Sequence, residues 1–167
     1  YFNFYYHLPF YITSAFLFLG ISMAGAFKLV MTIEILVAIL GFYFFSKLYL
    51  SKPAAIIASV LYLYTPYFAV DLYVRGALGE LAVLAILPWA FYALTLLITQ
   101  SSVSNLIIGS LILGLLGIAH NILNIFIFPW IFLYSFLLTT INNFQKKFIL
   151  VLLAFFLGIG LSSYYWL

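Results

Sequence analysis

Cysteine is absent from the sequence, and charged residues make up only 5% of it. Without cysteine there is no disulfide, no thiolate metal site and no cysteine nucleophile. Soluble globular domains carry about 25% charged residues, so the shortage of charge excludes that class. What remains is a chain that is 68% hydrophobic, with a mean hydropathy of +1.30. This composition predicts an all-α, polytopic transmembrane helical bundle.

Several other signals are missing. The apolar runs are continuous and do not alternate with a period of two, which argues against a transmembrane β-barrel. The sequence has no basic patch of the kind that binds nucleic acid, so no nucleic-acid partner is expected. The sequence contains no P-loop, no dinucleotide-binding glycine fingerprint, no HExxH helix and no nucleophile elbow. No catalytic motif of a soluble enzyme is therefore present.

The apolar runs predict a single transmembrane domain over residues 1–167. Residues 1–25 are expected to form an interfacial or re-entrant helix, because the apolar run at 10–19 is too short for a span, which needs about 20 residues. Residues 71–79 are expected to form a loop or surface turn. About six spans are predicted, at residues 27–50, 54–70, 78–98, 106–119, 122–141 and 148–167.

Lysines near the ends of the spans predict the orientation in the membrane. Counted from the first full span, Lys47, Lys52, Lys146 and Lys147 all fall on one side, which the positive-inside rule makes cytoplasmic. The other polar candidates then gather on the extracytoplasmic side: Asp71, Arg75, Glu80, His120, Asn121 and, if residues 10–19 do not cross, His7.

The main candidate site is the charged stretch at residues 71–80, because ionisable groups kept in a membrane protein are functional candidates by default. Asp71 and Arg75 are four residues apart, so one helical turn would pair them. Glu80 is expected in the first turn of the next span, where the helix dipole favours an acid. Two interpretations stand. The three groups neutralise one another and anchor an interfacial loop, or Arg75 binds an anionic headgroup such as a lipid-linked phosphate, with Glu80 orienting it or binding a sugar hydroxyl.

The remaining candidates are weaker. The pair His120-Asn121 ends a span and is more simply a polar cap than a ligand or catalytic pair. His7 lies among aromatic residues typical of a membrane interface, although such surfaces also stack on sugars. Glu34 and Lys28 are six residues apart and on different helix faces, so no pairing between them is expected and Glu34 is expected to face the interior. The small-residue spacing of the glycines at 109–117 indicates close helix packing.

Several stretches follow one pattern in order and spacing: FNFYYHLPFY at 2–11, AFKLV at 26–30, YTPYFAVDLYVRGALGE at 64–80, Pro88, AHN at 119–121 and LGIGLSSYYWL at 157–167. They resemble a family of bacterial membrane proteins labelled 6-pyruvoyl-tetrahydropterin synthase-related, which looks like a branch of the GT-C glycosyltransferase superfamily. The sequence departs from the pattern at His7, where related sequences usually have proline. The pterin label carries no weight, because that soluble enzyme uses a zinc site of histidines.

The resemblance implies a membrane-embedded enzyme that transfers a sugar from a polyprenyl-phosphate donor to an extracytoplasmic glycan, lipid or polymer at the plasma membrane. Arg75 would bind the donor phosphate, and Glu80, Asp71 and His120 would line the cavity. In GT-C enzymes an acidic extracytoplasmic loop precedes an aromatic juxtamembrane helix. Residues 1–19 look like that helix, so the catalytic acid is expected before Tyr1, and no cofactor is assigned, with a divalent metal left open.

Two other functions remain open. A transporter or flippase for lipid-linked intermediates would need charge at mid-bilayer depth, where only Glu34 qualifies. A non-catalytic structural membrane protein would use the charged stretch as a salt-bridged anchor.

Overall fold

The computed structural model describes residues 6–141 and 144–166, and this part of the chain contains helices and no strand. The prediction of an all-α fold is therefore confirmed. The elements are α1 (His7–Phe18), α2 (Met23–Ser46), α3 (Lys52–Leu63), α4 (Pro66–Val70), the π-helical turn η2 (Asp71–Arg75), α5 (Leu78–Gln100), α6 (Val103–Ala119), α7 (Asn121–Ile141), α8 (Phe144–Leu161) and α9 (Ser163–Trp166).

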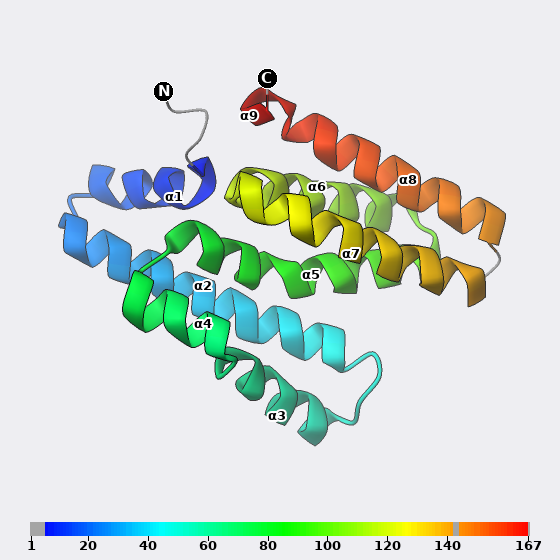
Figure 1. The fold of residues 1–167 in the computed structure, drawn as a ribbon, viewed down its shortest axis with the longest axis horizontal. Coiled ribbons are helices and arrows are strands. Elements are labelled where there is room, and N and C mark those ends of the chain that lie inside the picture. Colours follow the sequence, from blue (N-terminus) through cyan, green and yellow to red (C-terminus); the bar gives the residue numbers. More distant parts are fainter. Residues whose placement is uncertain (1–5, 142–143, 167) are drawn as a thin grey trace.

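Helix α5 forms the centre of the bundle, between α2 on one side and α6 and α7 on the other (Figure 1). In the most apolar stretch of α5, 61% of the residues are buried, against 28% in the corresponding stretch of α2 and 22% in that of α7. Helix α5 packs on α2 through Leu81 and Ala85. It packs on α6 to α8 through Leu94, Leu97 and their neighbours. The outer helices thus turn mostly apolar surface outward, as helices that face lipid do.

Three helices of the described chain, α2, α5 and α7, are long and apolar enough to cross a membrane. A fourth span results if α3 is counted with the segment Pro66–Arg75, although the two are bent by 47° at the break between them. The predicted number of six spans is thus not confirmed. The predicted span at 54–70 is instead two helices, because Pro66 cannot extend the helix before it and starts a new one.

Helix α1, from His7 to Phe18, lies within the predicted range of residues 1–25. Its 12 residues extend about 18 Å, well short of a hydrocarbon core of about 30 Å, so the prediction of a non-spanning N-terminal helix agrees with its length. The helix packs on α2, α5 and α6 near one end of the bundle (Figure 1).

Close packing of α6 on α8 confirms the expectation for the glycine-rich segment. A Cβ at Gly114 would lie 3.1 Å from the Leu161 Cβ, and one at Gly158 would lie 2.6 Å from the Leu113 Cβ. Side chains at these positions would push the two helices apart, so glycine sets their separation.

Candidate functional site

The turn η2 brings Asp71 and Arg75 together, as their four-residue spacing predicts. Arg75 Nη1 donates to Asp71 Oδ1 at 2.9 Å. The segment expected to be a loop or surface turn is thus helical as far as Arg75, because it continues α4 without a break. It stops at Gly76, whose φ of +59° is a left-handed conformation that glycine adopts at little cost.

Glu80 lies in the first turn of α5, where the sequence placed it, and binds the same guanidinium. Arg75 Nη1 donates to Glu80 Oε2 at 2.8 Å and Nη2 donates to Oε1 at 2.5 Å, which is the two-point fork of an Arg–carboxylate pair. The Tyr67 hydroxyl donates to the same carboxylate. Arg75 therefore joins η2 to the start of α5 across the Gly76 turn.

Burial within this ion-pair cluster, defined as Asp71, Arg75 and Glu80, differs sharply between the acids and the base. The side chain of Asp71 is 0% exposed and that of Glu80 12%, whereas that of Arg75 is 48% exposed. The two carboxylates are the buried members of the cluster, and about half of the Arg75 side chain is open to the surroundings. An anion that reached the cluster from outside would meet Arg75 first.

Tyr6, which the sequence analysis did not single out, connects the ion-pair cluster with α1 and with the junction of α6 and α7. Its ring lies directly against Gly79, since a Cβ at that position would be 2.4 Å from the ring. The ring also stacks on His120, with centroids 4.8 Å apart, and on Phe10 at 5.7 Å. The glycine next to Glu80 was the available signal, because a residue without a side chain allows a ring to approach the backbone.

His120 lies beside the ion-pair cluster and caps α7. Its Nδ1 accepts a hydrogen bond from the Leu123 N–H at 3.3 Å, so the interpretation as a helix cap is confirmed. Burial lowers the pKa of His120; the Arg75 charge lowers it further, and the Glu80 charge opposes both. Asn121 also serves the helix start, because its Oδ1 accepts from the Ile122 N–H at 2.8 Å.

Two further predicted residues have contacts of a different kind. His7 stacks on Tyr11 of its own helix, with ring centroids 5.6 Å apart. Glu34 faces the bundle interior, as expected, at 6% exposure, and neither of its oxygens has a hydrogen-bond partner among the residues that the structure describes. Lys28 is exposed, and in the described ranges it makes no ion pair with Glu34, in agreement with the spacing argument.

The arrangement of the helices separates the lysines from the ion-pair cluster. At one end of the bundle, α2 ends and α3 begins, and α7 ends and α8 begins; the predicted cytoplasmic lysines occur next to these helix ends. The turn η2, the start of α5 and the junction of α6 and α7 lie toward the other end (Figure 1). The prediction that these two sets of residues lie on opposite sides agrees with this arrangement. Within residues 6–141 and 144–166, no three His, Asp or Glu side chains are grouped to hold a metal ion.

Comparison with known families identifies the chain. It belongs to the family of the 6-pyruvoyl-tetrahydropterin synthase related domain, a membrane protein family, whose model matches residues 2–167. No curated protein and no solved structure matches the chain. The family and the apolar helices indicate a membrane location, while the similarity to GT-C glycosyltransferases stays a prediction.

Proposed function

We propose that this membrane protein takes part in the transfer of a sugar from a polyprenyl-phosphate donor to an acceptor on the extracytoplasmic side, and that Arg75 binds the donor phosphate. The observation that carries the proposal is a half-exposed Arg75 side chain whose guanidinium is fixed by two much more buried carboxylates. A guanidinium offers planar donors that match phosphate oxygens, and one fixed before binding loses less entropy when the ligand arrives.

The neighbours of Arg75 fit a headgroup site better than a simple anchor. An anchor needs only one acid for one base, but Asp71 and Glu80 both bind this guanidinium. Glu80 also receives the Tyr67 hydroxyl, so a carboxylate and a phenol lie side by side next to the arginine, as groups that bind sugar hydroxyls do. His120, whose pKa is lowered by burial, adds a ring nitrogen near the ion-pair cluster.

The test is the Arg75→Lys variant in lipid nanodiscs. Lysine keeps the positive charge for Asp71 and Glu80 but has no fork of donors, so we expect binding of farnesyl phosphate to weaken roughly ten-fold while the melting temperature changes little. The matched control is Lys52→Arg at the start of α3, away from the ion-pair cluster, which should bind the probe as the unaltered protein does.

The same pair of variants is then assayed for sugar transfer in membranes. A folded Arg75→Lys protein with normal phosphate binding would contradict the assignment of Arg75. Reduced phosphate binding with normal transfer would instead contradict the proposed reaction.

Translocation of lipid-linked intermediates is a second candidate, and Glu34 is the observation that favours it. An acid buried in the apolar helix α2 without a hydrogen-bond partner among the described residues is the kind of group that ion-coupled transporters use. On this alternative Glu34→Gln would stop translocation, whereas a transferase that uses the Arg75 site would keep its activity.

A further inference from the structure

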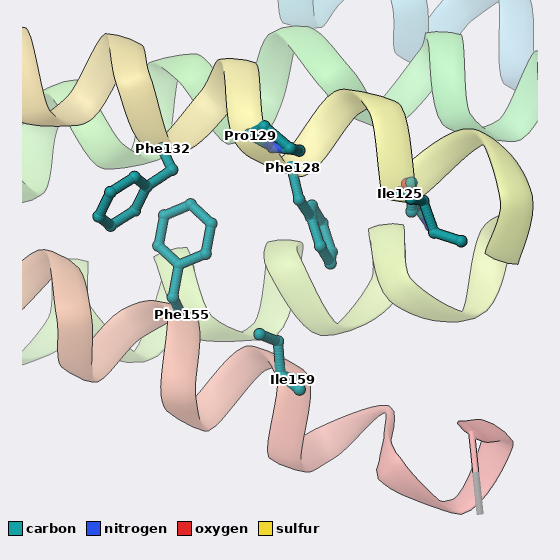
Figure 2. Close-up of a pocket in the computed structure, with 7 residues that line it drawn as sticks. Ile125, Phe128, Pro129, Phe132, Phe155 and Ile159 are labelled. Carbon is teal, nitrogen blue, oxygen red and sulfur yellow. The ribbon is translucent and has the colours of Figure 1, made fainter.

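A second potential binding site lies on the other side of the bundle, between α7 and α8. It is a cavity of about 350 Å³ that is largely open to the surroundings, lined on α7 by Phe128 and Phe132 and on α8 by Phe155 and Ile159 (Figure 2). This volume falls within the range of about 300–1,000 Å³ that is usual for small-molecule sites. Among the residues that the structure describes, no charged side chain lines it. The walls therefore suit a neutral, apolar ligand.

One end of this cavity carries hydrogen-bond acceptors that lack donors. Asn124, which lines the cavity, is 0% exposed; its Nδ2 donates to the Leu116 carbonyl, while its Oδ1 has no partner in the described part of the chain. Four residues after Ile125 comes Pro129, which has no N–H to donate to the Ile125 carbonyl. Ile125 and Pro129 both line the cavity. Two acceptors are thus left at the same end.

Unpaired acceptors within a membrane helix are costly, because the hydrocarbon core offers no water to satisfy them. The two acceptors also select their ligand. Phosphate and carboxylate groups are themselves acceptors when ionised and would be repelled, whereas a hydroxyl donates. The Arg75 site has the opposite preference, so the two sites would bind different compounds.

We propose that the cavity between α7 and α8 binds a neutral lipid that carries one hydroxyl group at the head of an apolar chain. The hydroxyl donates to Asn124 Oδ1 or to the Ile125 carbonyl, and the chain runs along α7 toward Phe132 and Phe155, whose rings lie 5.5 Å apart at the other end. From residue 124 to residue 132 the helix rises about 12 Å, enough for eight or more methylene groups.

Photolabelling tests this proposal in the whole protein, reconstituted in phosphatidylcholine nanodiscs. The probe is hexadecanol with a diazirine in its chain; the matched probes are its methyl ether, which cannot donate, and hexadecyl phosphate. We expect the alcohol to label α7 and α8 roughly five-fold more than the ether, which is the usual effect of one hydrogen bond, and the phosphate to label them least. Equal labelling by alcohol and ether, or no labelling of these helices, would overturn the proposal.

Two variants locate the label. Asn124→Leu removes the acceptor Oδ1 and should abolish the preference for the alcohol. Since this change also removes the contact with Leu116, a second variant, Ile159→Trp, fills the cavity from a half-exposed position and should remove labelling by every probe. Its control is Leu157→Trp on the same helix, similarly exposed to the outside but not part of the cavity wall, which should label normally. Undiminished labelling in folded Ile159→Trp would place the lipid elsewhere and refute the site.

Discussion

Asp71 and Glu34 are both buried acids in the first half of the chain, yet in the described part of the chain only Asp71 is paired with a base. Asp71 is 0% exposed and one of its oxygens lies 2.9 Å from Arg75 Nη1. Glu34 is 6% exposed, and neither oxygen has a hydrogen-bond partner among the described residues. An acid with a partner and one without thus occupy one membrane-embedded bundle.

The difference comes from local chain geometry. Asp71 has Arg75 one helical turn later, and the Gly76 turn brings a second acid to the same base. Glu34 lies in a regular helix whose buried face repeats every four residues, with Val30 before it and Ala38 after it. No base is available on that face. A buried acid is stabilised where the course of the chain brings a basic side chain next to it, and the regular helix α2 does not do this for Glu34.

The largest effect is expected from Arg75→Ala, which would turn Asp71 into a second acid without a base. Removing one partner of a buried pair leaves the other charge desolvated and uncompensated, so the melting temperature should fall on the order of 10 °C. Thermal unfolding in nanodiscs measures this. Lys52→Ala, an exposed lysine at the start of α3, is the control and should change nothing. An Arg75→Ala protein as stable as the unaltered one would show that the contacts of Arg75 with Asp71 and Glu80 add no net stability.

A smaller effect is expected from Gly79→Ala, which tests whether the position of Glu80 depends on Tyr6. The added methyl group would meet the Tyr6 ring at 2.4 Å, so the ring and α1 must move away from the start of α5. Overpacking of this kind should lower the melting temperature by about 5 °C.

Gly160→Ala provides the matched control for this change. A Cβ there meets nothing within 4 Å, and alanine favours a helix over glycine, so its melting temperature should stay the same or rise slightly. Equal behaviour of the two variants would mean that the contact between Tyr6 and Gly79 does not position the first turn of α5.

Sequence reasoning succeeded where the spacing along one segment decides the contact. The four-residue spacing of Asp71 and Arg75 predicted their pairing, and the preference of an acid for the start of a helix predicted the place of Glu80 in the first turn of α5. The buried orientation of Glu34 and its lack of a pair with Lys28 followed from helix periodicity in the same way. Local geometry was sufficient in these cases.

Sequence reasoning failed where segments that are far apart in the sequence come into contact. Nothing in the aromatic segment distinguishes Tyr6, which stacks on His120 more than a hundred residues later, from His7, which stacks within α1. The acceptor of Asn124 also gave no signal, because its cavity depends on how α8 packs against α7. Composition predicts a membrane helix well, but a bend at Pro66 decides whether two short helices count as one span.

The smallest effect is expected from Glu34→Gln, and it decides what an acid without a base does in this bundle. The amide has nearly the same volume and removes no ion pair, because the described residues offer Glu34 none, so the melting temperature should stay within about 2 °C. Glu34→Ala is the comparison: it empties the same space and should be clearly less stable, since a cavity costs more than a change of polar group. A large loss of stability in Glu34→Gln would show that the carboxylate itself binds a partner. Unchanged stability with lost translocation would instead assign Glu34 a role in function. An ionisable group inside a membrane is energetically costly, so one that the fold does not need is expected to be functional.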